Sequence, residues 1–330
     1  MRVTVLGGGS WGTALAHHMA GKGHEVTILV RELQVAEDIN NNHRNSVYLP
    51  GTDLHPSIQA ETEPRLALAD ADTCLLSIPC QFMRESLGRI ASCLPSHSTL
   101  VCASKGIEVA NMQRMSQVVE QVLPDYADRY AVLSGPSFAK EVVQGKPSAV
   151  VLACYDTQLG ERLRALFSNE RFRVYSSTDV PGVEIGGAVK NVIAIAAGLS
   201  DGLGLGHNAR AALITRGLAE ISRLGKALGA RESTFMGLSG MGDLVLTCAG
   251  DLSRNRQVGL RLAQGESMAQ INAGMIQVAE GVKTTEAVYL LSRKLDIEMP
   301  IAQAMYRLIS EGEEPVRLVN ELMTRTLREE

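Results

Sequence analysis

The sequence has few aromatic residues and lacks the cysteine patterns of disulfide-rich or zinc proteins. Aromatic residues make up 4% of the 330 residues, with one Trp, whereas 45% are hydrophobic. The six cysteines include no C-x-x-C pair, and the seven histidines form no H-E-x-x-H motif. We therefore predict neither a disulfide framework nor a metal site. A chain of this length and hydrophobicity is long enough for two domains with sizeable cores.

The sequence also lacks strong charge asymmetry and long hydrophobic runs. Lys and Arg number 32 against 36 Asp and Glu, a formal charge of −4, with no long single-sign run. This balance is not that of a nucleic-acid-binding protein. The apolar run 3–6 is too short for a signal peptide, and we predict no membrane span and a cytoplasmic location.

The pattern of strands and helices changes midway along the chain. Short β-branched runs alternate with helical patterns in the first half, at residues 2–6, 25–30, 73–78, 100–103, 131–134 and 149–153. Such alternation predicts an α/β domain with a mostly parallel sheet. Helical patterns then follow at residues 182–199, 208–229, 256–264, 283–294, 299–309 and 314–327. They predict an all-helical C-terminal domain.

A helix start marks the predicted boundary between these domains. Thr178 and Asp179 supply a capping signal, and Pro181 suits the first turn of a helix because its missing N–H would have no partner there. We therefore divide the chain into residues 1–180 and 181–330.

A glycine-rich motif follows the first predicted strand and opens a helical run. It reads Gly7-Gly8-Gly9-Ser10-Trp11-Gly12, which satisfies G-x-G-x-x-G in a strand-to-helix context. Gly7 permits a tight turn, Gly9 lets a pyrophosphate approach the backbone, and Gly12 lets the helix pack on the strand. The motif favours dinucleotide binding over an ordinary glycine-rich turn.

The second strand ends with charges that bear on the choice of dinucleotide. Arg31 suits the 2′-phosphate of NADP, and Glu32 suits the ribose hydroxyl of NAD. The sequence favours NADP(H) but leaves NAD(H) open, and Arg31 as a solvated strand-end charge is the alternative.

Polar residues follow two later strands, where parallel sheets bind ligands. Lys105 comes directly after the strand at 100–103, and Ser137 follows a Gly-Pro turn after the strand at 131–134. Both can meet an anionic ligand, although each can equally be an ordinary loop residue.

The helical half contains three further candidates. Lys190 lies in an apolar helical run, where Gly186 and Gly187 are expected to leave room beside its ammonium. Asp243 ends a glycine-rich turn. The segment 253–256, Ser-Arg-Asn-Arg, suits a phosphate, and Arg254 or Arg256 is also a candidate for the cofactor pyrophosphate. A snorkelling lysine and a helix cap followed by surface charge are the alternatives.

Taken together, these residues resemble the bacterial NAD(P)-dependent glycerol-3-phosphate dehydrogenases along essentially the whole chain. The resemblance rests on GGGSWGTALA (7–16), SKGIE (104–108), GPSFAKE (135–141), GGAVKNVIAIAAG (186–198), GDLVLTC (242–248), SRNR (253–256) and AEGV (279–282). It implies a Rossmann-like N-terminal domain and a helical C-terminal domain. The implied reaction is reduction of dihydroxyacetone phosphate to sn-glycerol 3-phosphate, a precursor of phospholipids.

The resemblance also implies roles for individual residues. Proton transfer falls to Lys190; our own hypothesis adds that Asp243 holds Lys190 in position and that Lys105 orients the substrate. Substrate contacts fall on Lys105, Gly135, Ser137, Lys190, Asp243, Ser253, Arg254 and Asn255. Cofactor contacts fall on Gly7, Gly9, Ser10, Trp11, Gly12, Arg31, Lys105, Ala139, Arg254, Val278 and Glu280.

Two alternatives to this activity remain. A β-hydroxyacid dehydrogenase of similar architecture would take a carboxylate in place of a phosphate ester. A catalytically silent NADP-binding sensor would keep the fold without the chemistry, although Lys105, Lys190 and Asp243 argue against it. Small-residue faces in the helical half predict a homodimer.

Overall fold

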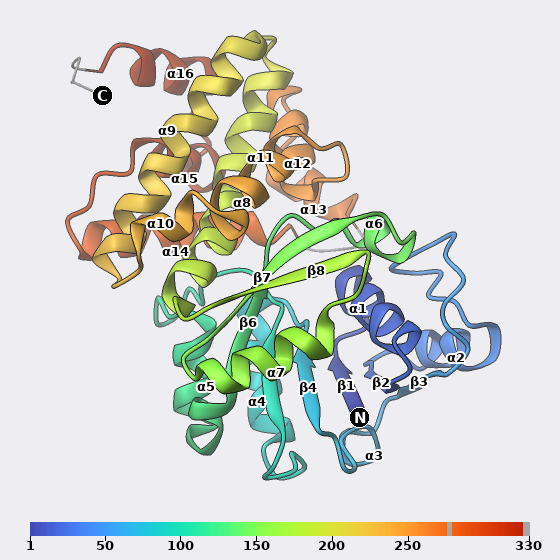
Figure 1. Cartoon of the computed structure of the whole chain (residues 1–330). Coiled ribbons are helices and arrows are strands. Elements are labelled where there is room, and N and C mark those ends of the chain that lie inside the picture. The colour runs from blue at the N-terminus through green and yellow to red at the C-terminus, as the bar shows by residue number, and fades with distance from the viewer. Residues whose placement is uncertain (276–278, 326–330) are drawn as a thin grey trace.

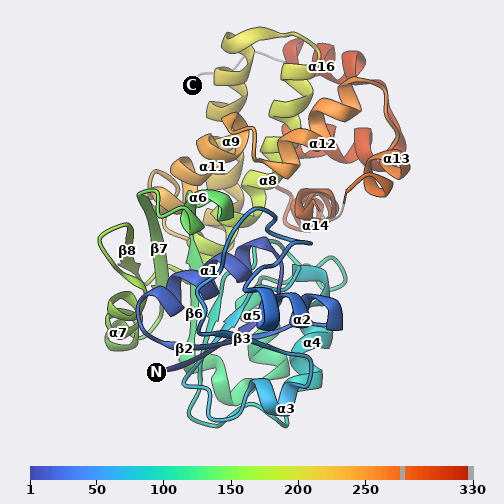
Figure 2. The same ribbon diagram turned by 90° about the vertical axis from the view of Figure 1, so that its right-hand side faces the viewer.

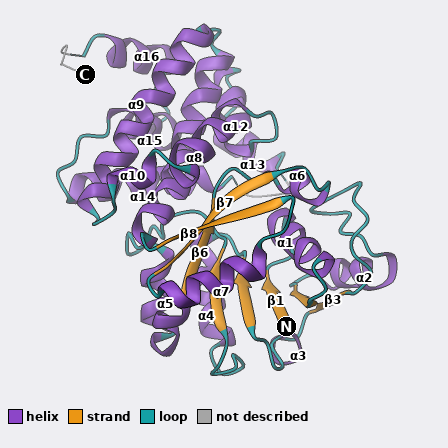
Figure 3. Cartoon of the chain, viewed as in Figure 1, coloured by secondary structure: helices purple, strands orange, loops and turns teal. Residues whose placement is uncertain are grey.

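A computed structural model describes residues 1–275 and 279–325 of the chain. Within these residues, a sheet flanked by helices forms one half and helices alone form the other, and the N-terminus lies in the sheet half (Figure 1). All strands found among the described residues belong to the first half (Figure 3). These are the α/β domain with a mostly parallel sheet and the all-helical C-terminal region that the sequence predicts.

One eight-stranded sheet organises the first half, in the order β3-β2-β1-β4-β5-β6-β7-β8. Neighbouring strands are parallel except β6 and β7, which are antiparallel. The strands are β1 (Arg2–Leu6), β2 (Glu25–Leu29), β3 (Ile58–Glu61), β4 (Thr73–Leu76), β5 (Thr99–Cys102), β6 (Tyr130–Ser134), β7 (Ser148–Cys154) and β8 (Phe172–Ser177). The six predicted strands are confirmed apart from small differences at their ends, and β3 and β8 are additional edge strands.

Helices cover the sheet and connect its strands. They are α1 (Ser10–Gly21), α2 (Leu33–Asn42), α3 (Pro64–Ala67), η1 (Cys80–Phe82), α4 (Met83–Ile90), α5 (Met115–Val122), η2 (Pro124–Arg129), α6 (Ala139–Val143) and α7 (Thr157–Phe167). Crossover helices of this kind let parallel strands lie side by side, so the loops after several strands meet at one edge.

The second half is built around a long buried helix. Its elements are α8 (Val180–Gly202), α9 (Gly206–Ala227), α10 (Glu232–Phe235), η3 (Leu238–Gly242), α11 (Asp243–Ala249), α12 (Arg254–Ala263), α13 (Met268–Ala273), α14 (Glu280–Lys294), α15 (Pro300–Tyr306), η4 (Arg307–Glu311) and α16 (Pro315–Met323). The predicted helix at 299–309 is divided into α15 and the π-helical η4. The predicted helix at 314–327 corresponds to α16, which ends earlier, at Met323.

Helix α8 connects the two halves and is capped as the sequence predicts. The side chain of Asp179 accepts a hydrogen bond from the Gly182 N–H at 3.0 Å, and Pro181 lies in the first turn. The helix packs against α9, α11, α12 and α14 (Figure 2). It is long and apolar enough to cross a membrane, but its most apolar window is entirely buried, which makes it a core helix. The predicted division at residues 180 and 181 falls in its first turn and stays a prediction.

Glycines let α8 and α12 cross at close range. A Cβ atom on Gly198 would lie 2.0 Å from the Arg256 carbonyl oxygen, and one on Gly259 would lie 2.0 Å from the Ile195 carbonyl oxygen. Any larger residue at either position would push the two helix backbones apart.

A cavity of about 710 Å³ lies away from the glycine-rich loop. Residues at the amino ends of β1 and β2 line it, among them Arg2 and Glu25. Because parallel sheets bind their ligands at the carboxyl ends of the strands, we place the functional site at the opposite edge.

Candidate active site

The glycine-rich loop between β1 and α1 is shaped by close backbone contacts. Gly7 has a φ of +111°, and a Cβ there would lie 2.4 Å from the Ser77 carbonyl oxygen. A Cβ on Gly12 would lie 2.1 Å from the Gly7 carbonyl oxygen. These contacts hold the loop and the start of α1 against the end of β4, so neither glycine can be replaced without moving the backbone.

The same loop is open at Gly9, where a phosphate would approach. A Cβ on Gly9 would meet no atom within 4 Å, and no side chain caps α1 at this N-cap position. The first N–H groups of a helix lack partners within the helix and attract anions. The loop therefore fits a dinucleotide pyrophosphate.

The other predicted cofactor residues near this loop differ in their surroundings. The indole nitrogen of Trp11 is buried without a hydrogen-bond partner in the described part of the chain. The Arg31 side chain is 82% exposed just beyond the end of β2 and pairs with Glu32 at 3.0 Å. Arg31 is thus accessible to an incoming phosphate, and Glu32 remains beside it.

Lys190, Asp243 and Lys105 converge from three distant segments of the chain. Lys190 Nζ donates to Asp243 Oδ1 at 2.5 Å, and Lys105 Nζ donates to Asp243 Oδ2 at 2.6 Å. The side chains of Lys190, Asp243 and Lys105 are 7%, 2% and 16% exposed, respectively. Helix α8, helix α11 and the loop after β5 therefore build one buried charged cluster.

Thr247 completes this cluster and was not among the predicted residues. Its hydroxyl donates to the Asp243 carbonyl oxygen at 2.6 Å, so its lone pair accepts from Lys190 Nζ at 2.7 Å. The signal available in the sequence was its spacing, since Thr247 lies four residues after Asp243 and hence on the same face of α11.

The three charged residues of the cluster carry a net positive charge. Burial and their mutual interactions shift the pKa values of Lys190 and Asp243. Burial lowers the pKa of Lys190 to about 8, and the positive charge of Lys105 adds to this shift while Asp243 opposes it. Burial alone would raise the pKa of Asp243, but the ammonium groups of Lys105 and Lys190 hold it below its ordinary value. Two cations thus share one anion, which suits an anionic ligand.

The space expected beside Lys190 is filled by protein. A Cβ on Gly186 would lie 2.5 Å from the Ser239 carbonyl oxygen, and one on Gly187 would lie 2.6 Å from Ser134 Oγ. The two glycines therefore bring η3 and the end of β6 close to α8, so protein occupies the room that the sequence led us to expect at these two positions.

The loop after β6 reaches the same cluster. The Gly135 carbonyl oxygen accepts from Lys105 Nζ at 3.2 Å and from Ser137 Oγ at 3.0 Å. Gly135 has a φ of +145°, and a Cβ there would lie 2.8 Å from the Val150 Cα. Helix α6 follows at once and begins at Ala139.

The segment 253–256 forms the start of α12. Ser253 Oγ caps this helix by accepting from the Arg256 N–H at 3.2 Å, as the cap alternative anticipates, and its own proton can still be donated to a ligand. Asn255 Oδ1 accepts from the Gly281 N–H at 3.0 Å. The Arg256 guanidinium donates to Asp201 and Asp251, so it is not directed at a pyrophosphate.

Glu280 links the helical half to the sheet. Its Oε1 accepts from the backbone N–H of Cys80, the first residue of η1 after β4, at 3.2 Å. Burial raises the pKa of Glu280, and the nearby charge of Arg254 opposes this shift. Val278, also a predicted cofactor residue, lies outside the described residues.

Comparisons with known proteins give one consistent result. Residues 2–160 match the family model described as NAD-dependent glycerol-3-phosphate dehydrogenase N-terminus, and residues 179–320 match the corresponding C-terminus. The chain belongs to this dehydrogenase family. Its two matched regions cover both the glycine-rich loop and the charged cluster.

Named relatives match over the whole chain. The chain is 59% identical over 330 residues to glycerol-3-phosphate dehydrogenase (NAD(P)+) of Nitratidesulfovibrio vulgaris Hildenborough, covering all of both chains. It is 58% identical, over the same full lengths, to the protein of that name from Oleidesulfovibrio alaskensis. A crystal structure of glycerol-3-phosphate dehydrogenase from Coxiella burnetii matches with a TM-score of 0.94 and 37% identity, covering 98% of this chain and 99% of that one.

Proposed function

We propose that this protein reduces dihydroxyacetone phosphate to sn-glycerol 3-phosphate with NAD(P)H and catalyses the reverse oxidation. The observation that carries the proposal is the buried cluster of Lys190, Asp243 and Lys105. This cluster is positively charged overall. The same chain carries a glycine-rich loop that fits a dinucleotide, and it belongs to this dehydrogenase family. The product would serve glycerophospholipid synthesis in the cytoplasm.

Residues of both halves would hold the cofactor. The loop of Gly7, Gly9 and Gly12 would receive the pyrophosphate, and the other predicted contacts are Ser10, Trp11, Arg31, Lys105, Ala139, Arg254, Val278 and Glu280. When bound, NAD(P)H supplies the hydride for the ketone carbon. The exposed guanidinium of Arg31 supports a preference for NADPH, because it can accept the additional 2′-phosphate.

Lys190 would protonate the carbonyl oxygen of the substrate. Its ammonium has three protons, two of which are directed at Asp243 and Thr247. The third can meet the oxygen on which negative charge develops during reduction. With a pKa of about 8, Lys190 is mostly protonated at neutral pH, yet it releases its proton more readily than an ordinary lysine does.

The phosphate of the substrate would bind at the start of α12. Ser253, Arg254 and Asn255 supply a hydroxyl, a guanidinium and an amide there. Lys105, Gly135 and Ser137 would contact the rest of the substrate from the sheet side. Binding energy from the phosphate then positions the carbonyl group for reaction.

The first experiment is an absorbance assay with the purified protein. Oxidation of NADPH and of NADH is followed with dihydroxyacetone phosphate, and then with a 2-keto or β-keto acid. Rapid oxidation with dihydroxyacetone phosphate alone supports the proposal and ranks the cofactors. Turnover only with the acid would replace it with the hydroxyacid activity, and cofactor binding without turnover would favour a sensor. Light scattering on the same sample tests the expected homodimer.

A further inference from the structure

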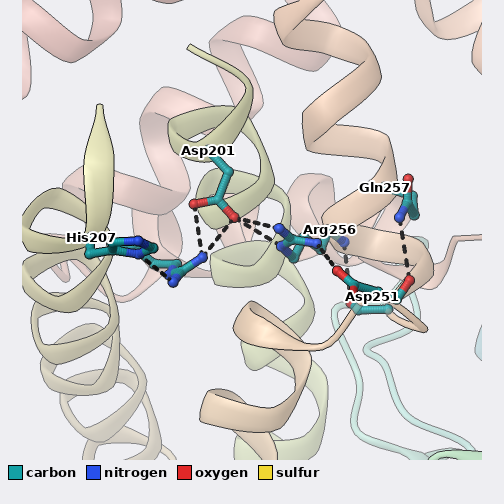
Figure 4. Close-up of polar contacts among 7 residues, drawn as sticks. Asp201, His207, Asp251, Arg256 and Gln257 are labelled. Atoms are coloured by element: carbon teal, nitrogen blue, oxygen red, sulfur yellow. Dashed lines mark hydrogen bonds and ion pairs between the residues drawn. The ribbon is translucent and has the colours of Figure 1, made fainter. Parts of the chain in front are cut away.

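An ion-pair network ties the end of α8 to the start of α12. Asp201, near the C-terminal end of α8, accepts from Arg256 Nε at 2.9 Å and Nη2 at 2.8 Å (Figure 4). Arg256 Nη1 also donates to Asp251 at 3.0 Å, and Arg210 Nη1 lies 3.2 Å from both oxygens of Asp201. The Arg256 and Asp201 side chains are only 12% and 14% exposed, so the pair is largely shielded from water.

This pair lies beside the glycine crossing of the two helices. Gly198 and Gly259 allow the backbones to touch, but they have no side chains that could interlock. These two glycine contacts therefore fix the distance between α8 and α12, but by themselves they do not fix how one helix is rotated or shifted along the other. A directional contact adds to that, and it is provided by Nε and Nη2 of one planar guanidinium, which both donate to Asp201 Oδ2.

Arg256 is also directly connected to the predicted phosphate ligands. Its backbone N–H donates to Ser253 Oγ, and Asp251, which its side chain binds, lies just before Ser253 in the chain. On the other side of the pair, Asp201 shares α8 with Lys190, about 16 Å away along the axis at about 1.5 Å per residue. The pair thus connects the phosphate end of the site with the helix that carries the proton donor.

We propose that Asp201 and Arg256 are positioning residues that place the phosphate-binding start of α12 relative to Lys190. Neither side chain is directed at the Lys190 cluster, and the charge of Arg256 is balanced by the two carboxylates it binds. Their effect on the reaction is therefore indirect, through the placement of Ser253, Arg254 and Asn255. This inference rests on the proposed function, since it assumes a phosphate-ester substrate.

The test compares Arg256→Ala and Asp201→Asn with the wild type at saturating NADPH. We expect the KM for dihydroxyacetone phosphate to rise about ten- to a hundred-fold, with kcat reduced much less. Calorimetric binding of sn-glycerol 3-phosphate to the NADP+-saturated protein should weaken by a similar factor, while NADPH affinity stays unchanged. Arg256→Lys should recover part of the loss because it keeps the charge without the fork of donors.

The matched control is Arg261→Ala on the same helix. Arg261 pairs with Glu266 at 2.5 Å but lies beyond the first turn of α12, so its loss should leave the KM unchanged.

Unchanged KM and calorimetric affinity in Arg256→Ala and Asp201→Asn would overturn the positioning role, as would a loss confined to kcat. If Arg256→Ala fails to fold, Asp201→Asn and Arg256→Lys decide the question. A wild type that neither reduces dihydroxyacetone phosphate nor binds sn-glycerol 3-phosphate would instead overturn the proposed function and this inference with it.

Discussion

At the scale of single residues, Lys190 is the group whose loss should affect chemistry most selectively. We expect Lys190→Met to lower kcat on the order of 10²- to 10⁴-fold, because the variant has no proton to donate to the developing alkoxide. Methionine has a similar length, and Asp243 keeps its contact with Lys105, so the fold should be retained. NADPH binding, measured by cofactor fluorescence, should be nearly unchanged.

The exposed Lys226, on the last turn of α9, provides the matched control for this substitution. Lys226→Met should keep wild-type turnover. Turnover of Lys190→Met within a few-fold of the wild type would rule out Lys190 as the proton donor.

The lowered pKa of Lys190 predicts how the reaction depends on pH. Because its pKa is about 8 rather than 10.5, the ammonium loses its proton as the pH rises through about 8. Reduction requires the protonated form, so kcat/KM for dihydroxyacetone phosphate should fall above that pH, whereas kcat/KM for oxidation of sn-glycerol 3-phosphate should rise. The two profiles, measured from pH 6 to 10 at saturating cofactor, should therefore have opposite slopes. A reduction profile that stays flat up to pH 10 would contradict the assignment.

The sequence identified this cluster only in part, for a physical reason. A lysine in a small apolar run and an aspartate after glycines are conspicuous, because burying either charge requires a partner. Thr247 is inconspicuous, since a threonine in a short helix fits many environments, and only the approach of α8 gives it a role. The close contacts of Gly186 and Gly187 likewise depend on η3 and β6, whose positions no local pattern encodes.

At the scale of secondary-structure elements, a buried carboxylate supports the start of α15. Glu220, on α9, is 2% exposed and accepts from the Ile301 and Ala302 N–H groups at 2.7 and 3.2 Å. Burial raises its pKa from 4.5 to about 7, and these two hydrogen bonds oppose the shift. Helix α15 thus begins on a side chain from another helix rather than on a cap of its own.

This arrangement predicts a pH-dependent stability. Between pH 4.5 and 7 the folded protein keeps the proton of Glu220 that the unfolded chain has already released, so stability should fall as the pH rises through this window. The total change is about 3 kcal/mol, at 1.36 kcal/mol per pKa unit. The free energy of unfolding of Glu220→Gln, measured in urea, should lack this contribution.

The exposed Glu232, in the first turn of α10, is the control. The free energy of unfolding of Glu232→Gln, measured in the same way, shows the effect of replacing a solvent-exposed glutamate. If the free energies of unfolding of the wild type and Glu220→Gln differ by the same amount at every pH between 4.5 and 7, Glu220 does not titrate in this window and the prediction fails.

Elements were predictable where their own residues determine them. Strand β1 and helix α8 are long or regular enough for periodicity and capping to define them. Strand β3 has four residues at the edge of the sheet, and α11 has seven. Their local preferences are weak, and tertiary contacts decide their structure. The antiparallel pairing of β7 with β6 depends on contacts between strands in the same way.

At the scale of the whole molecule, Glu184 joins the two halves. This buried residue on α8 accepts from Arg114 Nη1 at 2.6 Å, from the Ser116 N–H at 2.7 Å and from the Tyr130 hydroxyl at 2.7 Å. Its partners belong to the sheet half, whereas most of α8 packs among helices. The charged cluster needs both halves held together, since Lys105 comes from one and Asp243 from the other.

We therefore expect Glu184→Ala to destabilise the protein and to uncouple its halves. The Arg114 side chain is only 13% exposed, and removing its partner leaves a buried charge unpaired, which costs about 3–5 kcal/mol. The single Trp, Trp11, reports on the sheet half, while far-UV circular dichroism reports on the helices of both halves, most of whose residues lie in the C-terminal half. In the wild type the two signals should change together in urea, as cooperative unfolding requires.

In Glu184→Ala the fluorescence transition should occur at lower urea than the dichroism transition, because the unpaired groups lie in the sheet half. The control is Glu161→Gln on α7, whose ion pair with Arg164 is largely exposed, so its stability should change by no more than about 0.5 kcal/mol. Coincident transitions in Glu184→Ala, at the wild-type midpoint, would mean that apolar packing around α8 is sufficient to couple the halves. A separation of the two transitions would instead assign that coupling to one buried carboxylate, placed where the sheet meets the helix that carries Lys190.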